Sequence, residues 1–290
     1  MSLSLAAGLG VAALEFLRRR KRKQKALLGG APWRNKAPSR YLPFCPPAGV
    51  MNLRCPDHET DWIDIDTEYA HTLEMKSLLL AMNPSEVIGS IGHKDEGAAG
   101  SDALDLVLSD LAERFPGMVF REGPIVVNRV TGLRWDLNVT PPLQVAALLV
   151  QEDLVVMLPQ CDSLGCKNAY VLACAVVCFA DRWHLQDKMG LTLDGIHSPV
   201  PHYKPISKAV DGFFRKLEAS HGLRVRYNFT FQRCSALHLE EDAAPDSVGT
   251  AQTYLRVERQ GFRRLPNSDG VLFTIRTYIS PISEVPAHAH

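Results

Sequence analysis

The sequence predicts an α+β domain in which an antiparallel sheet is flanked by helices. Three late segments, at 223–232, 253–260 and 271–279, are rich in the β-branched and aromatic residues that favour strands. A run of almost wholly apolar residues at 170–179 has the character of a core strand and is too short to cross a membrane. An amphipathic helix is predicted at 206–219, just before the late strands. Strands that follow one another in this way pair most simply as antiparallel neighbours.

The first half of the domain is predicted to be mainly helical. Apolar spacing predicts one helix at 67–82, ended by an Asn-Pro pair, and a clearer one at 101–115. The intervening sequence IGHKDEGAAG is typical of a flexible loop. Segment 118–130 alternates between short strand-like runs and turns, and 143–158 divides most simply into a helix followed by a short buried strand.

Composition divides the 290 residues into four parts: an apolar and basic arm at 1–30, a proline-rich linker at 31–60, a globular domain at 61–283 and a disordered tail at 284–290. The contents of 46% hydrophobic and 22% charged residues are ordinary for a soluble globular protein. The seven cysteines are irregularly spaced. A disulfide framework is therefore not expected, and the chain is predicted to be intracellular.

The N-terminal arm joins an apolar segment at 3–17 to a basic cluster at 18–25. Its apolar part is shorter than the roughly 20 residues that span a bilayer. An apolar run followed by basic residues is nevertheless typical of a signal anchor that leaves the body in the cytoplasm. We therefore predict a possible membrane contact through residues 3–25, with a mitochondrial presequence or a plain basic tail as alternatives.

The formal net charge of zero conceals an asymmetry between the arm and the body. Residues 1–25 carry seven Lys and Arg and one Glu, which leaves 25 basic and 31 acidic residues in the rest. Nucleic-acid binding is not expected of the acidic body, because neutralising phosphates needs basic surface. An acidic body is compatible with a cationic amine as substrate.

The stretch at 179–203 gathers a tryptophan, three histidines and two prolines. Pro199 and Pro201 restrict the backbone, so 198–201 is predicted to be a stiff connection close to polyproline geometry. His197 lies at its edge. A rigidly held neutral imidazole suits a metal or a haem iron, although a histidine that merely caps the preceding segment is the plainer interpretation.

Several motifs here closely resemble the haem-binding alpha subunit of the haem-dependent oxidative N-demethylases. The matching runs are VCFADRW, KMG and IHSPVP in the middle of the chain, and YLRVERQ, RRLP and FTIRTYISP further on. The likeness extends more loosely from about residue 43 to residue 282. It implies haem bound in a PAS-like fold, with His197 of IHSPVP as the iron ligand and Tyr203 as a further contact with the cofactor.

The resemblance also implies an activity, which is removal of a methyl group from dimethylamine with oxygen and electrons from NADPH. In the family, other subunits carry FMN, an iron–sulfur cluster and a tetrahydrofolate site. We find no flavin motif, dinucleotide fold or ferredoxin-like cysteine spacing in this sequence. FMN, the 2Fe-2S cluster and NADPH are therefore expected only through a reductase partner.

Two late strands carry the remaining candidate residues. The period of two places Arg256, Glu258 and Gln260 on one face of a strand, which is either a solvated face or the wall of a site. The resemblance favours the wall, so Glu258 and Arg256 are the candidate catalytic residues. Arg276 and Tyr278 share a face of the last strand, where an arginine can pair with a haem propionate.

The chain departs from the family at two positions near the expected pocket. The family usually has Trp where Phe229 stands, and Gly where His202 follows the Pro-Val-Pro motif. These changes bear on the substrate more than on the haem. A haem-binding PAS-like sensor or carrier without catalysis, and a membrane-tethered scaffold, are the alternative functions, because a fold alone does not specify catalysis.

Overall fold

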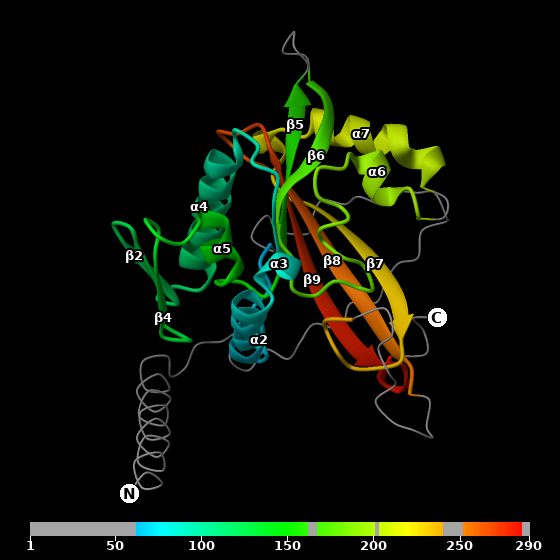
Figure 1. Cartoon of the computed structure of the whole chain (residues 1–290). Helices are drawn as coiled ribbons and strands as arrows, with labels where there is room; N and C mark the ends of the chain where they lie inside the picture. Colours follow the sequence, from blue (N-terminus) through cyan, green and yellow to red (C-terminus); the bar gives the residue numbers. More distant parts are fainter. Residues whose placement is uncertain (1–61, 162–166, 201–202, 240–251, 286–290) are drawn as a thin grey trace, which may run out of the picture.

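The computed structural model describes residues 62–161, 167–200, 203–239 and 252–285. Its main feature is a six-stranded sheet with the strand order β1-β6-β5-β9-β8-β7, in which all neighbours run antiparallel (Figure 1). In chain order the strands are β1 (Ile88–Ser90), β5 (Asp153–Cys161), β6 (Lys167–Val176), β7 (Arg224–Gln232), β8 (Tyr254–Arg264) and β9 (Val271–Pro281). A smaller antiparallel sheet contains β2 (Val119–Glu122), β3 (Ile125–Asn128) and β4 (Leu133–Asp136).

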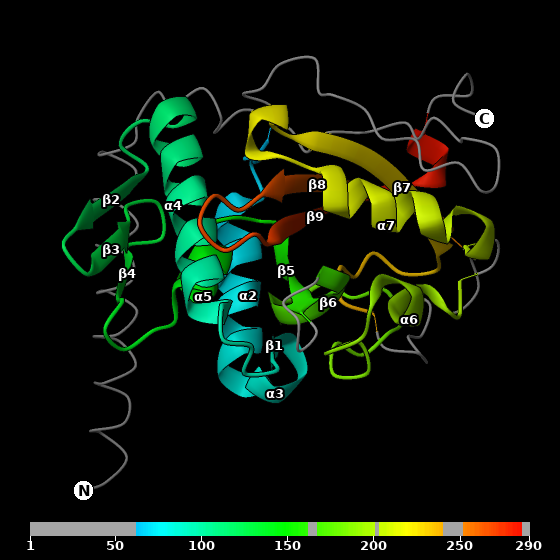
Figure 2. The same ribbon diagram turned by 90° about the horizontal axis from the view of Figure 1, so that it is seen from above.

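Helices lie on both faces of the six-stranded sheet, as Figure 2 shows from above. One face carries α2 (Tyr69–Met82), α4 (Glu96–Arg114) and α5 (Pro142–Ala147), and the other carries α6 (Leu193–His197) and α7 (Ser207–Lys216). The short helix α3 (Pro84–Val87) leads into β1. We call the two faces the α4 face and the α7 face. The predicted α+β class, with an antiparallel sheet flanked by helices, is confirmed.

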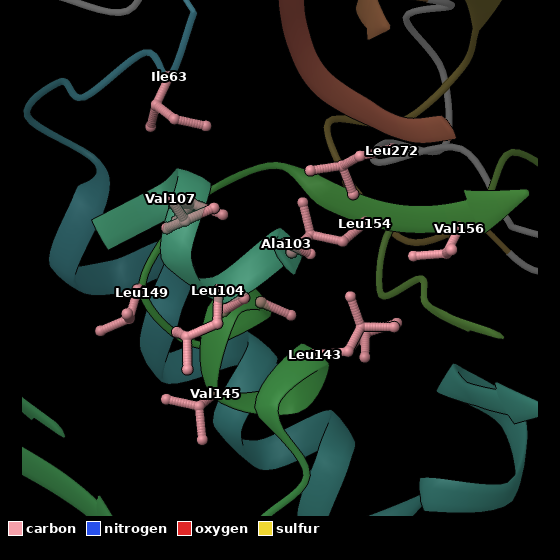
Figure 3. Close-up of a cluster of buried hydrophobic side chains, with 14 of the residues drawn as sticks. Ile63, Ala103, Leu104, Val107, Leu143, Val145, Leu149, Leu154, Val156 and Leu272 are labelled. Carbon is pink, nitrogen blue, oxygen red and sulfur yellow. The ribbon is translucent and has the colours of Figure 1, made fainter. Parts of the chain in front are cut away.

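The α4 face holds the larger hydrophobic core, part of which is drawn in Figure 3. Leu104 and Val107, at helical spacing on α4, point into the same buried cluster as Leu154 of β5 and Leu272 of β9 (Figure 3). Residues three or four apart share one face of a helix, so the apolar spacing read in the sequence becomes the surface that α4 buries.

An aromatic cluster fixes α7 to the other face. Phe214 of α7 meets Phe262 of β8 edge to face, with ring centroids 5.9 Å apart, and Phe262 stacks on Phe273 of β9 at 4.8 Å. Such pairs contribute about 0.5–1.5 kcal/mol beyond the area they bury. This apolar cluster anchors one end of the α7 face, and the polar residues described below lie further along β7 and β8.

The predicted helix at 67–82, the helix-then-strand division of 143–158 and the three late strands are confirmed. The helix predicted at 101–115 begins earlier, at Glu96, so the flexible loop predicted before it is wrong for its last residues. The Glu96 carboxylate explains the difference, because it accepts hydrogen bonds from the backbone N–H groups of Ile91 and His93 at 3.1 and 2.8 Å. These bonds fold the chain before the helix back onto its first turn.

The polyproline geometry predicted for 198–201 is wrong over the residues that the structure describes. Ser198 has φ −54° and ψ −34°, which is helical, and the N–H of Val200 donates to the carbonyl of His197 at 2.8 Å. The hydrogen-bonded turn offsets the preference of a residue before proline for extended geometry. His197 is held instead by α6, which Thr192 caps by accepting from the N–H of Gly195.

The arm at 1–30 and the linker at 31–60 lie outside the described residues, as does nearly all of the tail at 284–290. Their boundaries stay predictions, as does the membrane contact at 3–25. Among the helices of the described residues, none combines the length and the apolar character needed to cross a membrane.

Candidate functional site

A polar band runs across β7 and β8 on the α7 face of the sheet. Strand register sets it, because Arg256, Glu258 and Gln260 of β8 lie opposite Thr230, Asn228 and Arg226 of β7, in that order. Residues directly opposite in an antiparallel pair point to the same face. The shared face predicted for the three β8 residues is therefore confirmed, and β7 adds a second polar row beside it.

Glu258 is the central acid of this band. Its carboxylate accepts hydrogen bonds from the amides of Gln260 at 3.0 Å and Asn228 at 3.4 Å, and from Nε of Arg256 at 3.4 Å. Only 15% of its side chain is exposed. Three donors from two strands hold this half-buried carboxylate in one orientation.

Arg256 has a largely structural position beneath this acid. The side chain is fully buried, and it donates hydrogen bonds to the backbone carbonyls of Phe179 and Leu237. Its guanidinium thus ties β8 to two loops on the α7 face while its Nε contacts Glu258. The two predicted catalytic residues do lie together, but both terminal nitrogens of Arg256 donate to backbone carbonyls.

His197 is held at the end of α6 in a defined tautomer. Its Nδ1 lies 2.8 Å from the carbonyl oxygen of Leu193. A carbonyl can only accept, so Nδ1 carries the proton and Nε2 keeps its lone pair. Within the described residues Nε2 has no hydrogen-bond partner. Burial lowers the pKa of His197, although the bond to Leu193 acts in the opposite direction, so the imidazole is neutral at neutral pH.

Tyr203 packs directly on this imidazole. The two rings are nearly parallel, at 12°, with their centroids 4.5 Å apart. The Tyr203 side chain is buried, and its hydroxyl oxygen has no partner among the described residues. The structure therefore brings together His197 and Tyr203, two of the predicted cofactor contacts, and leaves a buried hydroxyl beside them without a hydrogen bond.

Arg276, the third predicted cofactor contact, does not join them. It lies opposite Arg259 in the ladder and points to the α4 face, where its guanidinium pairs with Asp66 at 2.7 Å. Tyr278, on the same face, donates to Asp64 at 2.5 Å. The shared face of Arg276 and Tyr278 is confirmed, but the sheet separates it from His197. Sequence spacing identified the residues that share a face and could not tell which face meets the imidazole.

The structure brings a different arginine to the α7 face, and sequence reasoning did not select it. Arg226 of β7 lies opposite Gln260, and its buried Nε has no hydrogen-bond partner in the described residues. Its positive charge helps to lower the pKa of His197. The available signal was the period of two, since Arg226 and Asn228 share a face of their strand as Arg256 and Glu258 do.

Hydrogen bonds connect several of the sequence motifs to neighbouring segments on the α7 face. Lys188 of the Lys-Met-Gly motif donates to the carbonyl of Ile196, the residue before His197, at 3.1 Å. Arg264, near the end of β8, donates to the carbonyls of Phe214 and Leu217 around α7. The Lys-Met-Gly motif thus contacts the motif that holds His197, and Arg264 fixes α7 on the same face of the sheet.

Comparison with protein families gives one match that covers most of the chain. The family described as haem-dependent oxidative N-demethylase, alpha subunit-like, matches residues 55–290. That range contains every described element and all of the residues discussed above. The chain belongs to the family of haem-dependent oxidative N-demethylase, alpha subunit-like proteins.

Proposed function

We propose that this protein binds haem through His197 and removes a methyl group oxidatively from a small methylated amine such as dimethylamine. Oxygen and externally supplied electrons complete the reaction, with a separate reductase as the electron donor. The observation that carries the proposal is the His197 ring, whose Nδ1–H is bound by the Leu193 carbonyl at 2.8 Å and whose Nε2 lone pair is free. A neutral imidazole held in this way is the form that ligates haem iron.

The residues around His197 fit a bound haem. Tyr203 stacks on the imidazole and fixes the plane of the ring. The buried Tyr203 hydroxyl and the buried Nε of Arg226 lack partners within the described residues, and buried polar atoms in that state call for a ligand. Haem supplies the activation of oxygen when it is bound. In this arrangement α6, with the sheet behind it, forms the PAS-like haem-binding unit that the family resemblance implies.

Glu258 is the residue that we propose to bind the substrate. A dialkylamine is protonated at neutral pH, and a half-buried carboxylate is the group that pairs with an ammonium ion in a partly dry site. The amides of Asn228 and Gln260 hold the Glu258 oxygens in place. Arg256, bound to backbone carbonyls, contributes by fixing the strand and orienting Glu258.

Replacing Glu258 with glutamine tests this assignment. The change keeps the size of the side chain and removes its charge, so a charge-assisted bond of about 1.5–3 kcal/mol is weakened to a neutral one of about 0.5–1.5 kcal/mol. We expect amine affinity to fall by about tenfold. Titration of the haem-loaded protein with dimethylamine, followed by the shift of the Soret band, measures that affinity.

The matched control for this test is Glu113→Gln, an exposed acid on α4 at the other face of the sheet. It should leave amine affinity unchanged. Both variants should retain wild-type haem content, since neither residue contacts His197. Unchanged amine affinity in Glu258→Gln would show that the band is ordinary polar surface.

The dependence on a reductase gives a second prediction. All strands of the two described sheets pair antiparallel, whereas the dinucleotide-binding unit needs parallel strands joined by helices. The purified, haem-loaded chain should therefore not oxidise NADPH in the presence of dimethylamine and oxygen. The absorbance of NADPH follows the reaction. Sustained amine-dependent NADPH oxidation by the chain alone would contradict the prediction.

The same preparation separates the enzyme from a haem-binding sensor or carrier. After chemical reduction, a demethylase should consume oxygen and release formaldehyde in an amine-dependent single turnover. A sensor or carrier would show a Soret band and no amine-dependent product. Absence of any haem absorption would leave the scaffold function.

A further inference from the structure

Arg226 is a half-buried cation without a hydrogen bond to any described residue. It lies on β7, the edge strand of the six-stranded sheet, and its Nε is buried without a partner. Within the described residues, no nitrogen of its guanidinium makes a hydrogen bond or an ion pair. A guanidinium stays charged, and leaving such a group partly dry without an anion is unfavourable.

Neighbouring arginines differ in this respect. Arg224, two residues earlier on the same strand, donates to the carbonyls of His221 and Leu223. Arg256 donates to carbonyls and to Glu258, and Arg276 pairs with Asp66 on the other face. Each makes at least one hydrogen bond or ion pair within the protein, although the Nε of Arg276 is also buried without a partner. Arg226 differs in that none of its guanidinium nitrogens has a partner among the described residues.

Glu258 does not pair with Arg226 among the described residues. Burial lowers the pKa of Arg226, and the opposing charge of Glu258 only partly offsets that effect. The two carboxylate oxygens of Glu258 already accept from Gln260, Asn228 and Arg256. Within the described residues these three contacts orient Glu258 without a hydrogen bond or ion pair to Arg226, so the Arg226 donors are left for an anion from outside the described chain.

The unpaired guanidinium of Arg226 lies on the same face of the sheet as the His197 imidazole. Arg226 lies on the face of the sheet that α6 and its His197 cover. Tyr203, stacked 4.5 Å from that ring, has a buried hydroxyl that also lacks a partner. A planar ligand whose metal meets the imidazole and whose edge bears carboxylates would supply anions to both groups.

We propose that Arg226 binds a carboxylate of the haem, with the Tyr203 hydroxyl as an additional donor to the carboxylate edge. The assignment rests on the proposed haem-binding function and replaces Arg276 in the role that sequence spacing had suggested. Guanidinium and carboxylate form two parallel N–H···O bonds, the strong geometry for this pair in a partly buried site. Arg226 is a binding and positioning residue in this scheme, and it has no part in the chemistry.

The test compares haem with its dimethyl ester, in which both carboxylates are neutral. Apoprotein is titrated with each compound, and affinity is read from the Soret band and from quenching of tryptophan fluorescence. The wild type should bind haem at least about tenfold more tightly than the diester, because charge-assisted bonds exceed neutral ones by more than about 1 kcal/mol. In Arg226→Met this preference should disappear, while affinity for the diester and the wavelength of its Soret band stay at their wild-type values.

Control variants and contrary outcomes distinguish a wrong role for Arg226 from a wrong haem-binding function. Arg224→Met, on the same strand, should keep the preference for haem, and Arg226→Gln serves as a second variant should the methionine variant fold poorly. Equal affinity of the wild type for haem and diester, or an equal loss of both in Arg226→Met, would overturn the role of Arg226 and leave haem binding intact. Absence of a Soret band in the wild type would instead refute the function on which the assignment rests.

Discussion

Replacing His197 with alanine should remove most of the haem from this protein. In the proposed function the neutral Nε2 of His197 is the iron ligand, and the Leu193 carbonyl that binds Nδ1–H would raise its basicity. Losing an outer partner of a metal ligand costs about 10- to 100-fold in metal affinity, and losing the ligand itself costs more. We therefore expect haem affinity to fall by more than about 100-fold, measured as haem content and Soret intensity after reconstitution.

Two further variants make the His197 result specific. His202→Ala removes another histidine of the same stretch and should leave haem content unchanged. His197→Gly should regain a haem spectrum when free imidazole is added, since the added ring takes the place of the missing side chain. Rescue by imidazole would not occur if the loss reflected misfolding.

A normal Soret band in His197→Ala would move the search to another ligand. Cys178 is a poor candidate because burial raises the pKa of its thiol to about 12, and the thiolate is the form that binds iron. His184 is exposed and lies in the loop between β6 and α6. It would be the next residue to replace.

Local pattern was enough to predict several elements of the fold. Apolar spacing located α7 and, less clearly, α2, and the strand character of three late segments located β7, β8 and β9. These predictions succeed because the period of side-chain burial is a property of a single element. The same period of two correctly predicted that Arg256 and Glu258 share a face of their strand.

Predictions that depend on one specific hydrogen bond were less successful. The start of α4 depends on Glu96 meeting two backbone N–H groups of the preceding turn, and the turn that contains Ser198 is closed by the N–H of Val200 donating to the carbonyl of His197. Neither interaction has a periodic signature. Propensity describes what a residue prefers in isolation, whereas a specific hydrogen bond selects among the conformations that propensity allows.

Assigning residues to the haem face was beyond the sequence for the same reason. Arg276 and Arg226 both lie in strands whose side chains alternate between the two faces of the sheet. Spacing within a strand does not tell which face of the sheet either arginine occupies. The faces are distinguished by Asp66, which is more than 200 positions away from Arg276 and meets it on the α4 face. The vacant donors of Arg226 become visible only when its neighbours are in place.

The buried pair of Arg276 and Asp66 gives the prediction with the largest expected effect on stability. Arg276 and Asp66 are 3% and 0% exposed, and their charged atoms lie 2.7 Å apart. Two further acids, Asp64 and Glu152, are buried beside them, and burial raises the pKa of Glu152. Removing the guanidinium would leave several buried carboxyl groups without their cation.

Arg276→Met should therefore lower the free energy of unfolding of the apoprotein by about 3–5 kcal/mol, the usual cost of removing one partner from a buried ion pair. Urea unfolding followed by circular dichroism measures it. The matched control is Arg121→Met, whose pair with Asp105 has a similar distance of 2.8 Å but is 42% and 67% exposed. That variant should lose no more than about 1 kcal/mol, because water already screens an exposed pair.

The two possible roles of Arg276 predict opposite results in this experiment. A structural cation destabilises the apoprotein when it is removed, and any loss of haem follows from the loss of fold. A cofactor-binding cation leaves the apoprotein stable and weakens haem alone, with the ester unaffected. The contact with Asp66 predicts the first result. If Arg276→Met unfolds like the wild type and loses only haem affinity, Arg276 would be a haem-binding residue and the assignment of Arg226 would be wrong.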